Sequence, residues 1–253
     1  MKEILNFGLQ PWCFADVREK LKEFLELNMH RPVENNKGGM KSTHLFWTWY
    51  AVNKIQPDNI IESGVFKGQG TWILRQAAPN AEIFSIDPNL NKRVYIDKEA
   101  RYFTDDFSII DWGTYIRGGE TLCFFDDHQN AYLRLQQMHW IGFQHAIFED
   151  NYPSIQGDCY SIKKVLSGSG LKKDSTEIVK PNCSHANMLL RRLETYTTFP
   201  PLCKLSKTRW GDKWDDENYP TPKAIFDNDE IQEYPLIFDE AGDYTWICYV
   251  KLK

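Results

Sequence analysis

The chain has 253 residues, of which 42% are hydrophobic and 26% are charged, a balance typical of a globular protein and not of a disordered one. The formal net charge of -5 argues against a general nucleic-acid surface. No apolar run approaches the roughly 18 residues of a membrane-spanning helix, and residues 1–10 carry no apolar signal-peptide core. We therefore expect neither nucleic acid nor a membrane among its partners.

The six cysteines include no CxxC pair, and their spacing fits neither a zinc ribbon nor a disulfide framework. We expect reduced, packed thiols and a cytoplasmic location. The length suits one large α/β domain, so residues 1–253 are predicted to form a single domain. The sequence also leaves open whether the chain forms a homo-oligomer.

The chain begins with a helical segment over residues 1–56. Residues 12–27 have the apolar spacing of an amphipathic helix. Ser42 or Thr43 is placed to cap a second helix that is rich in aromatic residues.

Short apolar strands then alternate with helices. Helices are predicted at residues 71–78 and 128–140, and strands are predicted at residues 59–62, 81–86, 101–104, 121–125 and 144–148. This alternation indicates a mostly parallel sheet. Four of the strands end in acidic residues, and ligands bind at the carboxyl ends of such strands.

The rest of the chain does not continue this alternation of strands and helices. Residues 167–214 contain an SGSG run, a predicted helix at 185–196 and two prolines, and we interpret them as a lid or insertion. Residues 234–239 and 244–252 alternate around a turn and predict a C-terminal antiparallel hairpin.

A glycine-rich loop follows the first strand, with the sequence Glu62-Ser63-Gly64-Val-Phe-Lys-Gly68-Gln-Gly70. Glycines let the backbone turn sharply there, and the next helix offers free N–H donors to a ligand. Asp87 ends the next strand, where an acid can accept hydrogen bonds from ribose hydroxyls. A plain tight turn and a helix cap are the alternatives for the loop and for Asp87.

The ExGxxxGxG spacing resembles the first motif of class I S-adenosylmethionine-dependent methyltransferases and differs from the GxGxxG of dinucleotide-binding proteins. The resemblance implies a Rossmann-like class I methyltransferase fold and S-adenosylmethionine as cofactor. In that family the region of Asp105 and Asp106 lines the adenine pocket, although an N-cap is an equal alternative. The implied cofactor-binding residues are Glu62, Ser63, Gly64, Gly68, Asp87, Asp106 and Asp126.

A second acidic group follows the last two strands of the alternation. Asp126, Asp127 and His128 come after one strand, and Glu149 and Asp150 come after the next. Both strand ends should face one crevice, and hard oxygen ligands suit Mg²⁺ or a similar divalent cation. The alternative is that these acids cap helices and make one cofactor contact.

The runs CFFDDHQNAY and AIFEDNYP resemble the metal-binding region of small-molecule O-methyltransferases, most closely the cephalosporin hydroxylase-like and macrocin O-methyltransferase-like group. The resemblance covers about residues 59–166 and implies Asp127, Glu149 and Asp150 as metal ligands. Asp126 is the alternative first ligand, and Asn151 can replace Glu149 in a catechol-type pattern.

These observations predict a metal-assisted O-methyltransferase that acts on a hydroxyl of a small molecule, sugar-like or natural-product-like. The catalytic residues are predicted to be Asp127, through the metal, and His128, which can accept the hydroxyl proton because its usual pKa lies near neutrality. A histidine that only orients a carboxylate is the alternative for His128. The competing functions are a nicotinamide-dependent oxidoreductase and a non-catalytic binding module.

Overall fold

The computed structural model describes residues 4–10, 13–173 and 176–253, and within them the main sheet has eight strands in the order β1-β9-β10-β6-β5-β2-β3-β4. The strands of this sheet are β1 (Asn6–Phe7), β2 (Asn59–Ser63), β3 (Glu82–Ile86), β4 (Arg101–Phe103), β5 (Thr121–Phe125), β6 (His145–Phe148), β9 (Leu193–Thr198) and β10 (Cys248–Leu252). A separate antiparallel pair joins β7 (Leu171–Lys173) and β8 (Thr176–Val179).

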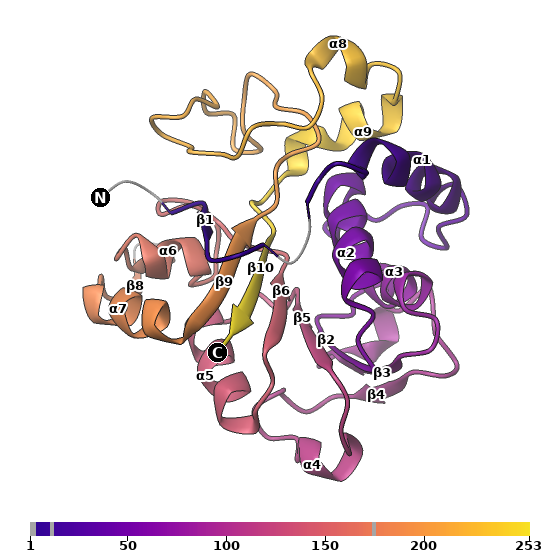
Figure 1. The fold of residues 1–253 in the computed structure, drawn as a ribbon, viewed down its shortest axis with the longest axis vertical. Coiled ribbons are helices and arrows are strands. Elements are labelled where there is room, and N and C mark those ends of the chain that lie inside the picture. The colour runs from indigo at the N-terminus through magenta and orange to yellow at the C-terminus, as the bar shows by residue number, and fades with distance from the viewer. Residues whose placement is uncertain (1–3, 11–12, 174–175) are drawn as a thin grey trace.

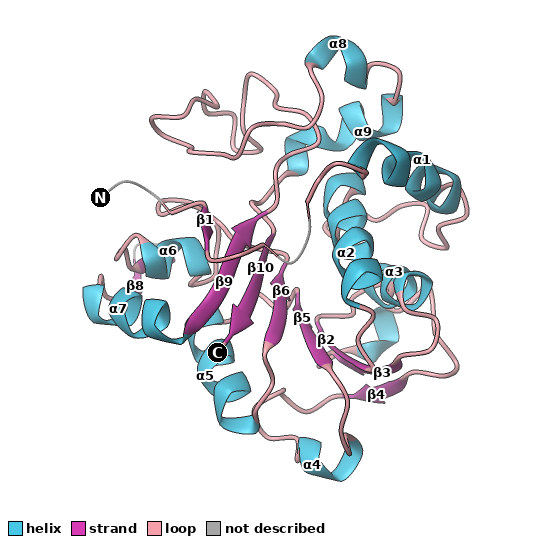
Figure 2. Ribbon diagram, in the orientation of Figure 1, coloured by secondary structure: helices cyan, strands magenta, loops and turns pink. Residues whose placement is uncertain are grey.

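Helices cover both faces of the sheet, as Figures 1 and 2 show. The helices are α1 (Val17–Asn28), α2 (Ser42–Ile55), α3 (Gln69–Ala77), α4 (Trp112–Tyr115), α5 (Ala131–Ile141), α6 (Ile162–Leu166), α7 (Cys183–Arg192), α8 (Asn228–Ile231) and α9 (Pro235–Glu240). Helices α1 to α3 lie on one face, and α5 to α7 lie on the other (Figure 1). None of the described helices combines the length and the apolar character needed to cross a membrane.

The topology confirms the expected Rossmann-like class I methyltransferase fold. Strands β4, β3, β2, β5 and β6 are parallel neighbours, which is the 3-2-1-4-5 order of a doubly wound sheet. The winding direction reverses between β2 and β5, and a crevice opens there at the carboxyl ends of the strands. Strand β10 is antiparallel to both β6 and β9.

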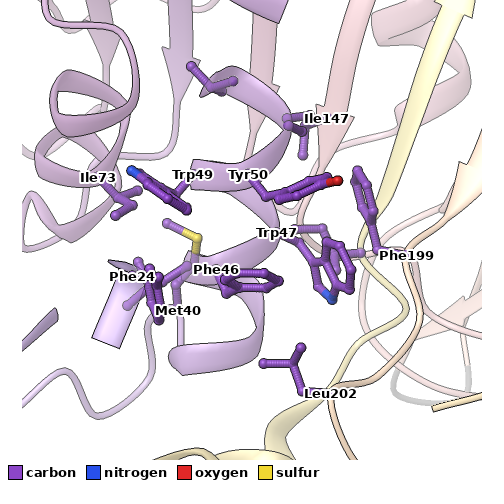
Figure 3. Packing of buried hydrophobic residues seen from close by; sticks show 14 of the residues in the cluster. Phe24, Met40, Phe46, Trp47, Trp49, Tyr50, Ile73, Ile147, Phe199 and Leu202 are labelled. Atoms are coloured by element: carbon purple, nitrogen blue, oxygen red, sulfur yellow. The ribbon is translucent and has the colours of Figure 1, made fainter. Parts of the chain in front are cut away.

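Two hydrophobic cores hold the helices to the sheet, because alternate strand residues point to opposite faces. Ile60 belongs to the core beneath α2 and α3, while its neighbour Ile61 belongs to the core beneath α5 to α7. Figure 3 shows α2 at the centre of the first core, where Trp47 stacks on Phe199 with ring centroids 5.1 Å apart. This packing fixes the amino end of α2 beside the carboxyl ends of the strands.

The predicted strands and helices of residues 59–148 are confirmed within a few residues. The N-terminal helix is also present, starting at Val17, and Trp12 of its predicted span lies outside the described residues. The helix predicted at 185–196 stops at Arg192, and strand β9 follows at once. The threonines and the tyrosine of β9 favour a strand over a helix.

The predicted C-terminal hairpin is wrong in one of its two strands. Residues 234–239 lie largely in helix α9, whose first residue is Pro235, a favourable residue at the first helical position. Strand β10 instead takes β9 as its antiparallel neighbour. The segment 167–214, which we predicted to be a lid or insertion, includes β9, a strand of the main sheet.

Candidate active site

A cavity of about 400 Å³ opens at the carboxyl ends of the central strands, a size that suits a small ligand. Its wall includes the glycine loop after β2, the end of β3, residues 104–106 after β4 and the acids after β5. Of the residues expected to bind the cofactor, five line this cavity: Ser63, Gly64, Asp87, Asp106 and Asp126.

Gly64 shapes the loop in two ways. Its φ of +103° lies in the region that only glycine adopts without strain. A Cβ at this position would lie 2.2 Å from the backbone oxygen of Asp126, so a side chain would push the loop off the end of β5. Gly68 also has a positive φ, but it packs against the backbone of Tyr95 and does not line the cavity.

Asp87 fixes the glycine loop from the end of β3. Its Oδ2 accepts hydrogen bonds from the backbone N–H groups of Val65 (3.1 Å) and Phe66 (2.8 Å), and its Oδ1 accepts one from Asn89 (2.7 Å). Each carboxylate oxygen can accept more than one hydrogen bond, so these contacts leave capacity for a ligand. Asp87 therefore orders the loop and faces the cavity at the same time.

Glu62 does not line the cavity, which corrects its expected role as a cofactor contact. It is fully buried beneath the loop, where its Oε2 accepts hydrogen bonds from Thr71 of α3 and Ser85 of β3, both at 2.6 Å. Burial raises the pKa of Glu62 to about 7, against the opposing effect of these two hydrogen bonds. Glu62 thus ties the loop to its two flanking elements.

Arg134 of α5 organises the acids after β4 and β5, and the sequence reasoning missed it. Its Nη1 and Nη2 donate to the carboxylate of Asp106 at 2.9 and 2.6 Å. The guanidinium holds the pKa of Asp106 well below its usual range. Arg134 Nε also donates to Asp127 Oδ2 at 2.9 Å, and Ser63 Oγ donates to that same oxygen at 2.8 Å.

This pairing turns Asp127 away from the expected metal site. A second cavity, of about 100 Å³, adjoins the first and is lined by Asp126, Glu149 and Asp150 but not by Asp127. Ligand atoms of Asp126, His128 and Asp150 all lie within 4.8 Å of one another. Of the two candidates for the first ligand, the geometry favours Asp126 over Asp127.

Glu149 lines the second cavity, but a histidine holds its carboxylate. His44, at the start of α2, has its Nε2 3.1 Å from the backbone N–H of Thr245, so Nε2 must accept. The Nδ1 of His44 lies 2.5 Å from Glu149 Oε1. Although burial opposes it, His44 lowers the pKa of Glu149, so this acid is ionised. No local sequence pattern indicates this contact, because residues 44 and 149 meet only in the fold.

Asp126 and Asp150 show the electrostatic strain of a crowded acidic site. Burial raises the pKa of both carboxyls, and the nearby charge of Glu149 raises them further. A bound cation would relieve this repulsion. Asn151, the alternative to Glu149, is instead buried, and its Nδ2 donates to Tyr196 and to the backbone oxygen of Trp246.

His128 is not suited to the predicted role of general base. Its Nδ1 lies 3.0 Å from Asp158 and 3.1 Å from Asp150. The hydrogen bond with Asp158 raises the pKa of His128 to about 9, against the opposing effect of burial. This shift favours the protonated ring over one that accepts a proton. Its contacts fit the alternative role of orienting a carboxylate.

Comparisons with known proteins found no matching family model and no matching curated protein. Among solved structures, the chain is similar to CmcI with Mg and SAM, at 18% identity and a TM-score of 0.35 over 42% of this chain. The similar region spans about half of that protein's length, 52%. Identities and TM-scores at this level carry no weight for function, which therefore rests on the residues of the site.

Two further similar structures contain SAH. One is the methyltransferase PaMTH1 of Podospora anserina, at 11% identity and a TM-score of 0.39 over 56% of this chain and 73% of that chain. The other is an O-methyltransferase from Bacillus cereus, at 13% identity and a TM-score of 0.34 over 52% of this chain and 66% of that chain.

Proposed function

We propose that this chain is an S-adenosylmethionine-dependent O-methyltransferase that acts on a small molecule with the help of a divalent cation. One observation carries the proposal: the cavity beside the glycine loop and Asp87 adjoins the acidic cavity, and the two share Gly38, Gly39, Asp126 and His128. A nucleoside cofactor in the first cavity would lie next to an acceptor in the second.

The lining of the larger cavity fits S-adenosylmethionine. Asp87 and Asp106 offer carboxylate oxygens to hydroxyl and amino groups, and Phe66 and Ile86 offer apolar contacts to a flat ring. In the smaller cavity, the carboxylates of Asp126 and Asp150 have oxygens within 4.8 Å of each other, and such a pair suits a divalent cation. Mg²⁺ prefers oxygen ligands, so Asp126 and Asp150 would hold it.

When bound, S-adenosylmethionine would supply an electrophilic methyl group, and a cation held by Asp126 and Asp150 would lower the pKa of the acceptor hydroxyl. The chain itself positions the cofactor and the acceptor. Asp87 orders the loop that faces the cofactor cavity. His44 orients Glu149, and His128 orients Asp150. Holding the two reactants in line is a large part of such catalysis.

A crystal structure with S-adenosylhomocysteine and Mg²⁺ tests this proposal. We expect the nucleoside against Gly64 and Asp87, and an ion with oxygen ligands at about 2.0–2.1 Å beside Asp126 and Asp150. A well-ordered structure in which the nucleoside lies elsewhere, or in which these carboxylates hold no ion at millimolar Mg²⁺, would contradict it.

A further inference from the structure

Two basic residues that lie far apart in the sequence line the acidic cavity. Lys41 immediately precedes α2, and Arg209 lies in the loop that connects β9 to α8 (Figure 1). Both line the cavity that contains Glu149 and Asp150. Neither residue was singled out by the sequence, because neither belongs to a motif.

Among the described residues, the charged groups of Lys41 and Arg209 have no carboxylate partner. In the described part of the chain, no hydrogen bond or ion pair engages the ammonium of Lys41 or the guanidinium of Arg209. The two buried carboxylates nearby already have partners, since Glu149 pairs with His44 and Asp150 with His128. Two unpaired cations beside a cavity are a site for an anionic group.

The guanidinium of Arg209 also lies near two aromatic rings. Its Cζ lies 5.9 Å from the ring centroids of both Tyr152 and Trp210. Trp210 in turn stacks on Trp246, with centroids 6.1 Å apart and an angle of 15° between the rings. The N–H donors of a guanidinium form a planar fork that matches a carboxylate. Tyr152 and Arg209 line the same cavity.

We propose that the acceptor is a hydroxy acid, whose carboxylate is bound by Arg209 and Lys41 while its hydroxyl faces Asp126 and Asp150. This inference deepens the proposed function and rests on it for the role of the hydroxyl. Asp243 also lines the cavity and disfavours an anion, but no ion pair joins it to either cation. The lining of this cavity thus offers both cations for a carboxylate and acids for a cation-bound hydroxyl.

The test uses glycolate, which has a hydroxyl and a carboxylate, and glycolamide, its neutral counterpart. Each is titrated by NMR into the full chain with S-adenosylhomocysteine and Mg²⁺, and binding is followed at the Arg209 guanidinium and the Trp210 indole. We expect glycolate to bind at least about tenfold more tightly, because hydrogen bonds to a charged group are the stronger ones. Equal affinities would overturn the inference.

Variants assign the effect to the site. Arg209→Gln should abolish the preference for glycolate, and Arg209→Lys, which keeps the charge but not the fork, should reduce it. Lys207→Gln removes one charge from the same loop outside the cavity and should leave the preference unchanged. A preference that survives Arg209→Gln would overturn the assignment.

Inorganic phosphate tests the class of anion, and tighter binding of phosphate than of glycolate would overturn the choice of a carboxylate. Failure of this inference is distinguishable from failure of the proposed function. If S-adenosylhomocysteine binds and the carboxylate preference is absent, only the hydroxy-acid acceptor is wrong. If S-adenosylhomocysteine itself does not bind, the proposed function is wrong.

Discussion

Two adjacent carboxylates after β5 have different environments. Asp126 lies in the group with His128 and Asp150, where burial raises its pKa. Asp127 is held by Arg134 and Ser63. Under the proposed function, Asp126 would bind the cation, whereas Asp127 supports the structure.

This division predicts opposite effects for two matched variants. Asp126→Asn should weaken Mg²⁺ binding at least about tenfold without loss of stability, because it removes a crowded charge. Asp127→Asn should keep Mg²⁺ binding and cost about 1–3 kcal/mol of unfolding free energy, because Arg134 loses one charged partner. Calorimetric titration with Mg²⁺ and urea unfolding of each variant separate the two effects. The reverse pattern would show that Asp127 is the ligand.

Sequence patterns indicated which acidic residues lie at the site, but not where their side chains point. The predicted strand ends and the glycine spacing place Asp87, Asp126 and Asp150 at one crevice. These features can be read from the local sequence alone. The choice between Asp126 and Asp127 depends on Arg134, which lies on the following helix. His44 and Arg209 come from distant segments, so no local pattern could have indicated them.

At the scale of elements, the glycine loop is the joint between β2, α3 and the end of β5. Gly64→Ala should abolish binding of S-adenosylhomocysteine, because its Cβ would meet the Asp126 backbone 2.2 Å away. Overpacking of this kind costs about 1–3 kcal/mol in addition to the cost of the positive φ. Calorimetry with S-adenosylhomocysteine and urea unfolding measure the two effects.

Gly142→Ala is the matched control for Gly64→Ala. Gly142 also has a positive φ, +94°, but a Cβ there would meet no atom within 4 Å. Gly142→Ala should therefore lower the unfolding free energy only by the cost of the positive φ, about 1–2 kcal/mol. It should bind S-adenosylhomocysteine as the parent chain does. Normal binding by Gly64→Ala would refute the role given to the loop.

The elements that sequence reasoning placed correctly have strong local periodicity, as in the five parallel strands. The wrongly predicted elements lie after residue 166, where local secondary-structure propensity and tertiary strand pairing favour different structures. Strand β9 continues directly from α7, and its pairing with β10 crosses about fifty residues of chain. Local alternation cannot reveal a partner at that distance, so residues 234–239 looked like the missing strand.

At the scale of the whole molecule, buried Glu62 makes folding depend on pH. Its pKa rises from the usual 4.5 to about 7 in the folded chain. A raised carboxyl pKa means that the folded state binds the proton more tightly, so this stabilisation is full below about pH 4.5 and is lost as pH rises through 7. The maximal effect is about 3 kcal/mol.

Urea unfolding at about pH 5 and pH 8 tests this dependence. Glu62→Gln should lose less stability over this interval than the parent chain, because its amide does not titrate. Glu82→Gln, at an exposed site on the neighbouring strand β3, should behave as the parent chain does. The same loss of stability in Glu62→Gln and in the parent chain would show that Glu62 does not titrate in this range.

The central claim is that the cavity beside the glycine loop binds S-adenosylmethionine, and calorimetric titration with S-adenosylhomocysteine tests it most directly. The parent chain should bind this nucleoside and not NAD. Asp87→Ala should weaken binding by about 1–3 kcal/mol, whereas Asp58→Ala, which removes a similar contact to a backbone N–H at the opposite end of β2, should not weaken it. Binding of NAD without binding of S-adenosylhomocysteine would contradict the account.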